Sequence, residues 1–350
     1  MSWPHPGWAG RSHRQNWLPD SKLIDTTWLR PGLPQADNLV IAGSIAEKKN
    51  EVLNMLLCTQ TDVLTQHMTE EAALDLLAQA GFEAADLSLF RLQQTPRWSG
   101  SDYLEEARRL GEYAARRGVP ILQAHAPFSF PYKTADFDRD IFPVIWRGTE
   151  IAAAAGAKRI VVHPIQHGQI KDADDKKLFN FNLTFYRRLA PLCERYQTTI
   201  CVENMWSYDP RRRCIDHDVC SRPAEFCRYV DSLQAAFGSS FAACLDLGHA
   251  PLVGVALPDM IQQLGPRIQA LHIHDNNYHE DSHTLPGHSE LDLPAAFRAL
   301  GQIGYQGLFT LEADNFFIHQ APALYPATLT YMRQVSAYYR DLLLAAAASS

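Results

Sequence analysis

The stretch "YLEEARRLGEYAARRGVPILQAHAP", residues Tyr103–Pro127, contains one helix-to-strand unit of the predicted fold. Its first part has apolar residues at helical spacing, and Gly118 is placed to end the helix. The apolar run "VPILQA" that follows is typical of a buried strand, and His125 stands where that strand ends. A helix that leads directly into a strand in this way predicts parallel strands joined by crossover helices.

The same alternation continues along the rest of the chain. Helical patterns such as "TEEAALDLLAQAGF" (69–82) and "FNLTFYRRLAPLCERY" (181–196) lie between apolar segments that are typical of strands. The seven further strand candidates are "VLNMLLCT" (52–59), "AADLSLF" (84–90), "KRIVVHP" (158–164), "TTICVENMW" (198–206), "FAACLDLGH" (241–249), "QALHIHDN" (269–276) and "GLFTLEAD" (307–314).

Eight strands that alternate with helices predict an α/β fold, namely a (β/α)8 TIM barrel that forms a single domain. We expect the barrel to occupy residues 37–350. Residues 1–36, rich in Pro, Trp and polar residues and without periodicity, are expected to form an irregular N-terminal extension. An open doubly wound sheet is the alternative, which is disfavoured because no glycine-rich phosphate loop follows the first predicted strand.

The composition limits the class of protein. The chain has 350 residues, a net charge of −7 and 46% hydrophobic residues, which is ordinary for a globular protein. The negative charge gives no support for nucleic acid as a partner, because nucleic-acid-binding domains usually carry a basic face. Seven cysteines, with no secretory segment near Met1, indicate a reducing, cytoplasmic location. No apolar run approaches the ~20 residues of a membrane span, so no membrane association is expected, whereas a homo-oligomer stays open.

Polar side chains stand at the carboxyl ends of six successive predicted strands. They are His125, His163, Glu203, Asp246, His272 and Glu312, at intervals of 26 to 43 residues. Such an interval corresponds to about one strand–helix unit per step. Barrel enzymes build their active sites at the carboxyl ends of their strands, so we expect these side chains to meet at one mouth.

The sequence around these residues indicates what they do. Glu203 and Glu312 follow apolar strand residues, where an unpaired buried carboxylate would be costly, so a cation or strong donors are expected beside them. A salt bridge across the barrel rim is the alternative. His125 and His163 each stand just before a proline segment that ends the strand, and their alignment with the other strand ends favours contact with a substrate or a metal.

Two further positions belong to the same mouth. In "CLDLGHAP" (244–251), Asp246 can point inward while His249 reaches the same cavity from the loop, with an Asx turn as the alternative. His272 and His274 alternate along one strand and therefore face the same side. We expect one of these two histidines to be a ligand and the other to lie behind it, with a buried core histidine as the alternative.

Seven short motifs occur in an order and spacing that resemble the xylose-isomerase-like TIM barrel superfamily. They are "HAP" (125–127), "HP" (163–164), "VEN" (202–204), "DLGH" (246–249), "HIHDN" (272–276), "DSHTLPG" (281–287) and "TLEAD" (310–314). The resemblance covers about residues 50–340. This group contains isomerases and epimerases of sugars and sugar phosphates, inosose dehydratases and abasic-site nucleases of the endonuclease IV type.

The resemblance implies one divalent metal ion, Mn, Mg or Co with Zn as an alternative, held by Glu203, Asp246, His272 and Glu312. The implied activity is isomerisation or epimerisation of a sugar, sugar phosphate or related polyol ketone through proton abstraction and an enediolate. Glu203 and Glu312 would be catalytic, and a small carbohydrate would be the substrate. The other polar residues of the mouth are assigned to substrate binding: His125, His163, His249, His274, Asp281 and His283.

Three other functions are compatible with parts of this pattern. An endonuclease IV-like metal-dependent phosphodiesterase is favoured by residues that stand where a three-zinc nuclease has further ligands: His125, His163, His249, Asp281 and His283. The loops "HAPFSFPYKTADFD" (125–138) and "HPIQHGQIKDADD" (163–175) are apolar or acidic, so a nucleic-acid substrate is disfavoured. An inosose-type dehydratase uses the same proton abstraction, and the sequence does not separate it from an isomerase. A non-catalytic sugar-binding barrel is disfavoured because all four metal ligands are present.

Overall fold

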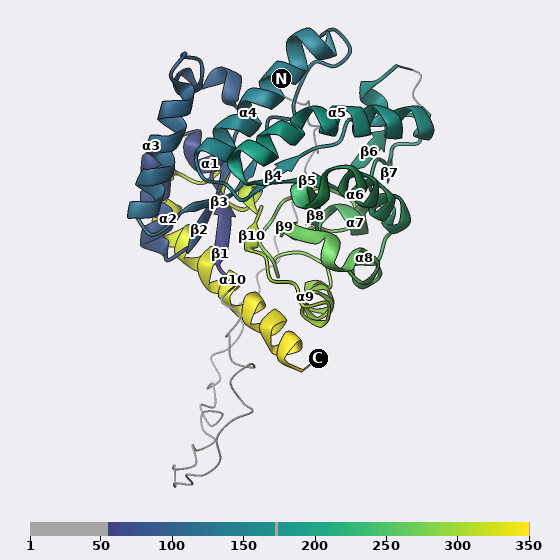
Figure 1. Ribbon diagram of the computed structural model, residues 1–350. Helices are drawn as coiled ribbons and strands as arrows, with labels where there is room; N and C mark the ends of the chain where they lie inside the picture. Colours follow the sequence, from purple (N-terminus) through teal and green to yellow (C-terminus); the bar gives the residue numbers. More distant parts are fainter. Residues whose placement is uncertain (1–54, 172–173, 350) are drawn as a thin grey trace, which may run out of the picture. The chain divides into compact units, whose positions relative to one another are not determined.

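The computed structural model of the chain describes residues 55–171 and 174–349. Eight parallel strands form one sheet in the order β10-β1-β2-β3-β4-β5-β8-β9 (Figure 1). Their bounds are Leu57–Gln60 (β1), Ala84–Ser88 (β2), Ile121–His125 (β3), Arg159–Val162 (β4), Thr199–Glu203 (β5), Phe241–Asp246 (β8), Ile268–His272 (β9) and Phe309–Leu311 (β10). All eight predicted strands are therefore confirmed. The predicted boundary between the extension 1–36 and the barrel lies outside the described residues.

The two strands at the ends of this order, β9 and β10, meet and close the sheet into a barrel. The backbone N–H of Ile273 donates to Thr310 O at 3.0 Å, and that of Glu312 donates to Ile273 O at 3.0 Å. A parallel bridge between Ile273 and Leu311 results. Every residue of β1, β5 and β8 is buried, as expected for parallel strands that are covered on both faces. The predicted (β/α)8 TIM barrel is confirmed, and the open doubly wound sheet is wrong.

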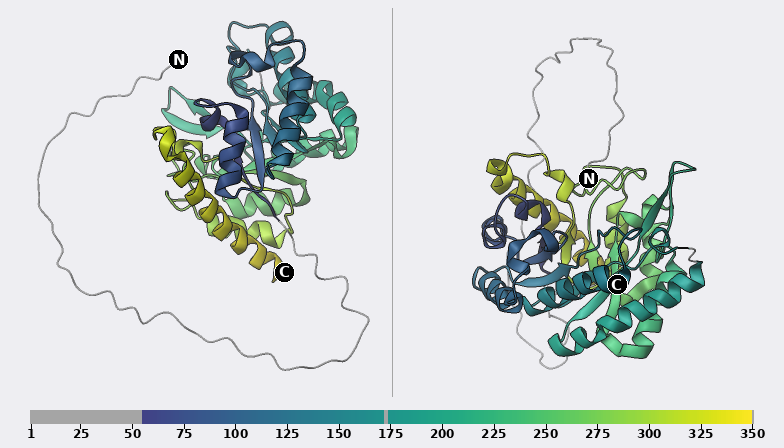
Figure 2. Two further views of the ribbon diagram at one scale, coloured as in Figure 1. Left: turned by 90° about the vertical axis from the view of Figure 1, so that its left-hand side faces the viewer. Right: turned by 90° about the horizontal axis from the view of Figure 1, so that it is seen from above.

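Helices cover the outside of the barrel (Figure 1). Their bounds are Asp62–Thr65 (α1), Glu70–Ala80 (α2), Tyr103–Arg116 (α3), Phe142–Ala154 (α4), Asp175–Tyr196 (α5), Pro223–Phe237 (α6), His249–Leu252 (α7), Leu257–Leu264 (α8), Leu293–Gln302 (α9) and Tyr325–Ala348 (α10). Helix α5 begins earlier than its apolar pattern predicts, because the Asp174 side chain accepts a hydrogen bond from Lys177 N–H at 2.7 Å. The long helix α10 packs along α9 and α2 (Figure 2).

Four neighbouring strands place small buried residues inside the barrel and ligand-type residues two positions further along. The small residues are Val161 (β4), Cys201 (β5), Cys244 (β8) and Ala270 (β9), which form a separate buried cluster with Ala242. Because side chains two apart on a strand point to the same side, the residues that follow them face the barrel interior as well. These are His163, Glu203, Asp246 and His272. Strand periodicity therefore places these four candidate ligands at one mouth of the barrel.

A short antiparallel hairpin, which the sequence did not predict, follows β5. Its strands are Trp206–Asp209 (β6) and Cys214–His217 (β7), seen at the rim of the barrel in Figure 1. Asp209 Oδ1 accepts backbone hydrogen bonds from Arg211 at 2.8 Å and Arg212 at 3.1 Å, which fixes the turn between the two strands. Among the described residues, no helix combines the length and apolarity needed to cross a bilayer.

Candidate active site

Four side chains meet at the carboxyl ends of the strands, and we call them the central group. They are Glu203 at the end of β5, Asp246 at the end of β8, His272 at the end of β9 and Glu312 directly after β10. Their ligand atoms all lie within 4.8 Å of one another, and all four residues are buried. His272 Nδ1 is 3.2 Å from Glu203 Oε1 and 2.9 Å from Glu312 Oε2. A single cation could therefore contact all four residues.

The unsatisfied atoms of the central group fit a cation. Glu203 Oε2 and Glu312 Oε2 are buried and accept no well-oriented hydrogen bond from the described residues, although an imidazole nitrogen lies close to each. Three buried carboxylates also repel one another, which is costly without a counter-charge. Burial raises the pKa of Glu203, but the imidazoles of His272 and His163 outweigh burial and hold that pKa well below its usual range. Glu203 is thus ionised and available as a ligand.

A histidine pair extends the site on the side of β3 and β4. His125 Nε2 and His163 Nε2 are 3.0 Å apart, and His163 Nε2 is 3.0 Å from Glu203 Oε2. Phe90 packs on His125 with ring centroids 4.7 Å apart, and Phe128 packs on His163 at 4.5 Å. Burial lowers the pKa of His163, although the Glu203 carboxylate opposes this shift. His125 Nδ1 faces the carbonyl of Ala126, so His125 Nε2 is the acceptor in this pair and the Nε2–H of a neutral His163 is the donor.

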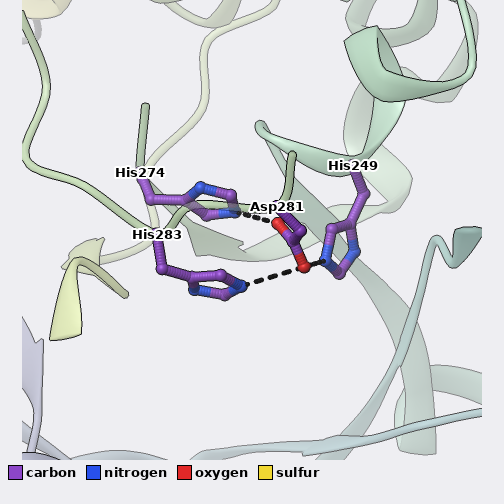
Figure 3. A group of neighbouring side chains, drawn as sticks. All are labelled: His249, His274, Asp281 and His283. Atoms are coloured by element: carbon purple, nitrogen blue, oxygen red, sulfur yellow. Dashed lines mark hydrogen bonds and ion pairs between the residues drawn. The ribbon is translucent and has the colours of Figure 1, made fainter. Parts of the chain in front are cut away.

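A second group of four ligand-type residues lies beside the central group. It consists of His249, His274, Asp281 and His283, whose ligand atoms are within 4.8 Å of one another. Figure 3 shows the Asp281 carboxylate between His249 on one side and the rings of His274 and His283 on the other. Asp281 Oδ2 is 3.3 Å from His249 Nε2 and 3.2 Å from His283 Nε2. The rings of His274 and His283 stack at 3.9 Å with an interplanar angle of 10°.

The loop that carries Asp281 and His283 connects β9 to α9 and is held in place by one buried carboxylate. Asp275 accepts backbone hydrogen bonds from Gly287 at 2.9 Å, Ser289 at 3.0 Å and Leu291 at 3.0 Å. Asp275 N–H also donates to Thr284 O at 2.8 Å. These bonds give an irregular segment a defined path over the mouth, so its two ligand-type side chains have fixed positions.

Backbone carbonyls set the orientation of three histidine rings. The Nδ1 atoms lie 2.8 Å from Ala126 O in His125, 2.8 Å from Asn204 O in His249 and 2.9 Å from Glu312 O in His283. A carbonyl oxygen can only accept, so each Nδ1 carries the proton. In the neutral rings the Nε2 lone pairs then point into the site. A hydrogen bond of this kind, made by the ring nitrogen that faces away from the site, is typical of metal-binding histidines.

Asp246 is held between the two groups by several donors. Its Oδ1 accepts from the backbone N–H of Gly248 at 2.7 Å and of His249 at 2.8 Å. His274 Nε2 lies 3.1 Å and 3.2 Å from the two carboxylate oxygens. Asn204 binds the backbone of the same residue through both atoms of its amide. The geometry therefore places His272 against the glutamates and His274 behind Asp246, where it orients the carboxylate.

In the second group, a proton and a cation would compete for the same imidazole nitrogen. Burial lowers the pKa of His249, but the carboxylates of Asp246 and Asp281 outweigh burial and raise it to about 10. Burial raises the pKa of Asp281, but His283 and His249 outweigh burial and hold that pKa well below its usual range. A proton on Nε2 compensates the carboxylate here, and a cation at the same nitrogen would replace that proton.

The mouth contains every site residue that the sequence predicted, divided among the central group, the histidine pair and the second group. Other side chains that were not predicted also contact these residues, among them Gln60, Phe90, Phe128 and Trp206. Gln60 Nε2 donates to Glu312 Oε1, and Trp206 Nε1 donates to Asp281 Oδ2 at 3.1 Å. Gln60 could have been found from the rule used for the other strands, because it ends β1. Trp206 could not, since it lies on the unpredicted hairpin.

Comparison with known proteins identifies the family of this chain. Residues 74–335 match the family model described as xylose isomerase-like TIM barrel, which spans more than half of the chain. An uncharacterised protein of Methanocaldococcus jannaschii is 25% identical over 224 residues, which are 62% of this chain and 72% of that protein.

Two solved structures with similar folds carry the names of epimerases. One is a D-tagatose 3-epimerase-like protein with a TM-score of 0.63 and 19% identity, covering 83% of this chain and 98% of that chain. The other is 3-keto-D-glucoside 4-epimerase from E. coli, with a TM-score of 0.59 and 18% identity, covering 80% of this chain and 99% of that chain. At these identities the likeness shows the shared fold.

Proposed function

Because the chain belongs to the xylose isomerase-like TIM barrel family, we propose that it is a metal-dependent isomerase or epimerase of a sugar or a related polyol ketone. The observation that carries this proposal is the central group, in which three carboxylates and one imidazole from four strands converge in a buried mouth. The names of the structurally similar epimerases support the same class of substrate.

The central group would hold one divalent cation through Glu203, Asp246, His272 and Glu312. Three oxygen ligands and one imidazole suit Mn, Mg or Co, with Zn as an alternative. When bound, such a cation polarises a substrate carbonyl and makes the neighbouring C–H bond more acidic. The fit rests on one buried oxygen each of Glu203 and Glu312 that accepts no well-oriented hydrogen bond from the described residues.

Glu203 and Glu312 are the residues we assign to proton transfer. Their carboxylates lie 3.2 Å and 2.9 Å from His272 Nδ1 but come from β5 and β10, with β8 and β9 between them. A substrate at the mouth would thus meet a carboxylate on each of two sides. One carboxylate removes the proton alpha to the carbonyl, and the other, after taking up a proton from solvent, returns it to the opposite face or to the adjacent carbon.

The surrounding residues would bind the substrate and exclude water. The protons on His249 and on His163 Nε2 make both rings donors to a substrate oxygen. Phe90 and Phe128 form an apolar wall beside the histidine pair. Such a wall limits water beside the histidine pair, which strengthens the electrostatic interactions of these rings with a bound substrate.

Solvent deuterium exchange tests this proposal. The chain is loaded with Mn²⁺ or Co²⁺ and incubated in D₂O with a panel of ketoses, sugar phosphates and inososes. We expect deuterium at a carbon alpha to the carbonyl. Glu312→Gln should lower the rate by about 10²–10⁴-fold, whereas Glu290→Gln, at an exposed position of the mouth loop, should not change it. Product analysis separates isomerisation and epimerisation from loss of water by an inosose-type dehydratase. No exchange in any ketone, in a preparation shown to contain the cation, would overturn the proposal.

The second group favours one further candidate, a metal-dependent phosphodiesterase. Hydrolysis of phosphate esters uses cations about 3.5–4 Å apart, and His249, Asp281 and His283 offer ligands for another cation beside the central group. The negative net charge and the acidic mouth loops favour a small diester over duplex DNA. Release of p-nitrophenol from bis(p-nitrophenyl) phosphate, with an abasic duplex in parallel, tests this candidate. A cation-loaded chain that cleaves neither compound would exclude it.

A further inference from the structure

The hairpin after β5 sends one side chain into the second group. Trp206 is the first residue of β6, and its indole Nε1–H donates to Asp281 Oδ2 at 3.1 Å. The indole ring also contacts His249, with ring centroids 6.4 Å apart and an interplanar angle of 72°. The same carboxylate oxygen therefore faces an indole donor and the two imidazole nitrogens described above.

Trp206 is itself fixed from two directions. Gln166 Nε2, from the loop after β4, donates to Trp206 O at 2.9 Å. The neighbouring Met205 N–H donates to Val219 O at 3.0 Å, and Trp206 pairs with His217 across the hairpin. The indole thus projects from a backbone that is held at both ends, so it can act as a fixed donor rather than follow the loop that carries Asp281.

The histidines cannot replace this donor once they bind a cation. In His249 and His283 the Nδ1 protons are used by backbone carbonyls, so each neutral ring presents only an Nε2 lone pair to Asp281. Two lone pairs facing a carboxylate oxygen repel it. Among the described residues, Trp206 is the one non-titrating side chain that donates to Asp281. Its bond therefore survives when protons leave the imidazoles.

We propose that Trp206 is a positioning residue that holds Asp281 Oδ2 in place and thereby sets the affinity of the second group for a divalent cation. This rests on the further cation considered under the second candidate function. One lone pair of Oδ2 takes the indole N–H, and the other remains for the cation. Loss of an outer-shell partner of a ligand typically lowers metal affinity by about 10–100-fold.

Titration with Co²⁺ of the chain freed of metal tests the proposal. Wild type is expected to bind at two distinguishable sites, and Asp281→Asn identifies which isotherm belongs to the second group. Trp206→Phe keeps a large ring but lacks the donor, so it should weaken only that isotherm, by about 10–100-fold. Tyr208→Phe is the matched control, because Tyr208 lies on the same strand with 55% of its surface exposed. Equal affinity of Trp206→Phe and wild type would overturn the proposal.

A metal-free readout separates this inference from the proposed function. In the ¹⁵N spectrum, the indole N–H signal that Trp206→Phe removes should be protected from exchange, and Asp281→Asn should shift it and shorten its lifetime. An unprotected signal would overturn the hydrogen bond on which the inference depends. Binding of one Co²⁺ only, at the central group, would overturn the inference and leave the proposed isomerase standing. No binding at all would instead refute the proposed function.

Discussion

Gly248 leaves room for the ring of His274, and this close approach gives a quantitative prediction. A Cβ atom at position 248 would overlap the ring atoms Cε1, Nε2 and Nδ1 of His274. The backbone of Gly248 has φ −80° and ψ −35°, which any residue can adopt, so Gly248→Ala would introduce a steric effect alone. His274 would have to leave its position between Asp246 and His283.

The expected cost follows from the contacts that His274 would lose. Inserting a methyl group into a packed interior costs about 1–3 kcal/mol. Loss of a hydrogen bond to a charged group, here between His274 Nε2 and Asp246, costs about 1.5–3 kcal/mol. The two terms overlap, because moving the ring relieves the clash, so we expect Gly248→Ala to lower the free energy of unfolding by about 2–5 kcal/mol.

Urea unfolding followed by circular dichroism, in the presence of EDTA, measures this change. Gly168→Ala is the control, since a Cβ there would meet no atom within 4 Å. The sharper comparison uses His274→Ala as the background, in which Gly248→Ala should cost less than about 0.5 kcal/mol. An equal cost in both backgrounds would show that the clash with His274 is not the cause. A cost near zero in the wild-type background would refute the reasoning as a whole.

Three further predictions concern the proposed cation, a carboxylate that we assign to proton transfer, and one ion pair. A divalent cation at 100 times its dissociation constant should raise the free energy of unfolding by about 2.7 kcal/mol, and thermal unfolding with Mn²⁺ or EDTA measures this. Glu203→Gln should abolish turnover while circular dichroism shows an intact fold, so substantial activity in the variant with cation present would contradict the assignment. Hydrogen bonds to Asp218 and Asp175 outweigh the opposing effect of burial and raise the pKa of His167 to about 9. The stability that His167 contributes is therefore full below about pH 6.5 and is lost as the pH rises through about 9. The stability difference between wild type and His167→Ala should therefore shrink over that range, and a difference independent of pH would contradict it.

Strand periodicity explains why so much of the fold and of the central group could be predicted. A buried parallel strand is a short apolar run, and the carboxyl ends of all eight strands open onto one face of the barrel. A polar residue that ends such a run on the interior side of its strand therefore points toward the mouth. Glu203, Asp246 and His272 followed directly from this rule, because each stands two positions after a small interior residue.

Strand periodicity predicts nothing about segments outside the strands. Asp281 and His283 lie on an irregular loop, so their approach to His249 depends on the bonds of Asp275 rather than on any repeat in the sequence. The hairpin that carries Trp206 has strands of four residues with a Pro-Arg-Arg-Arg turn, which lack an apolar alternation long enough to predict a strand. Tertiary contacts, not local pattern, determine both.

The main-chain acceptors of the three histidines make the protonation of these rings robust to mutation. A substitution can remove a side chain but not the carbonyl at Ala126, Asn204 or Glu312. Even the Glu312→Gln variant keeps the acceptor of His283. A substitution elsewhere around the mouth can therefore change the other contacts to a ligand while the ring nitrogen that faces it stays the same.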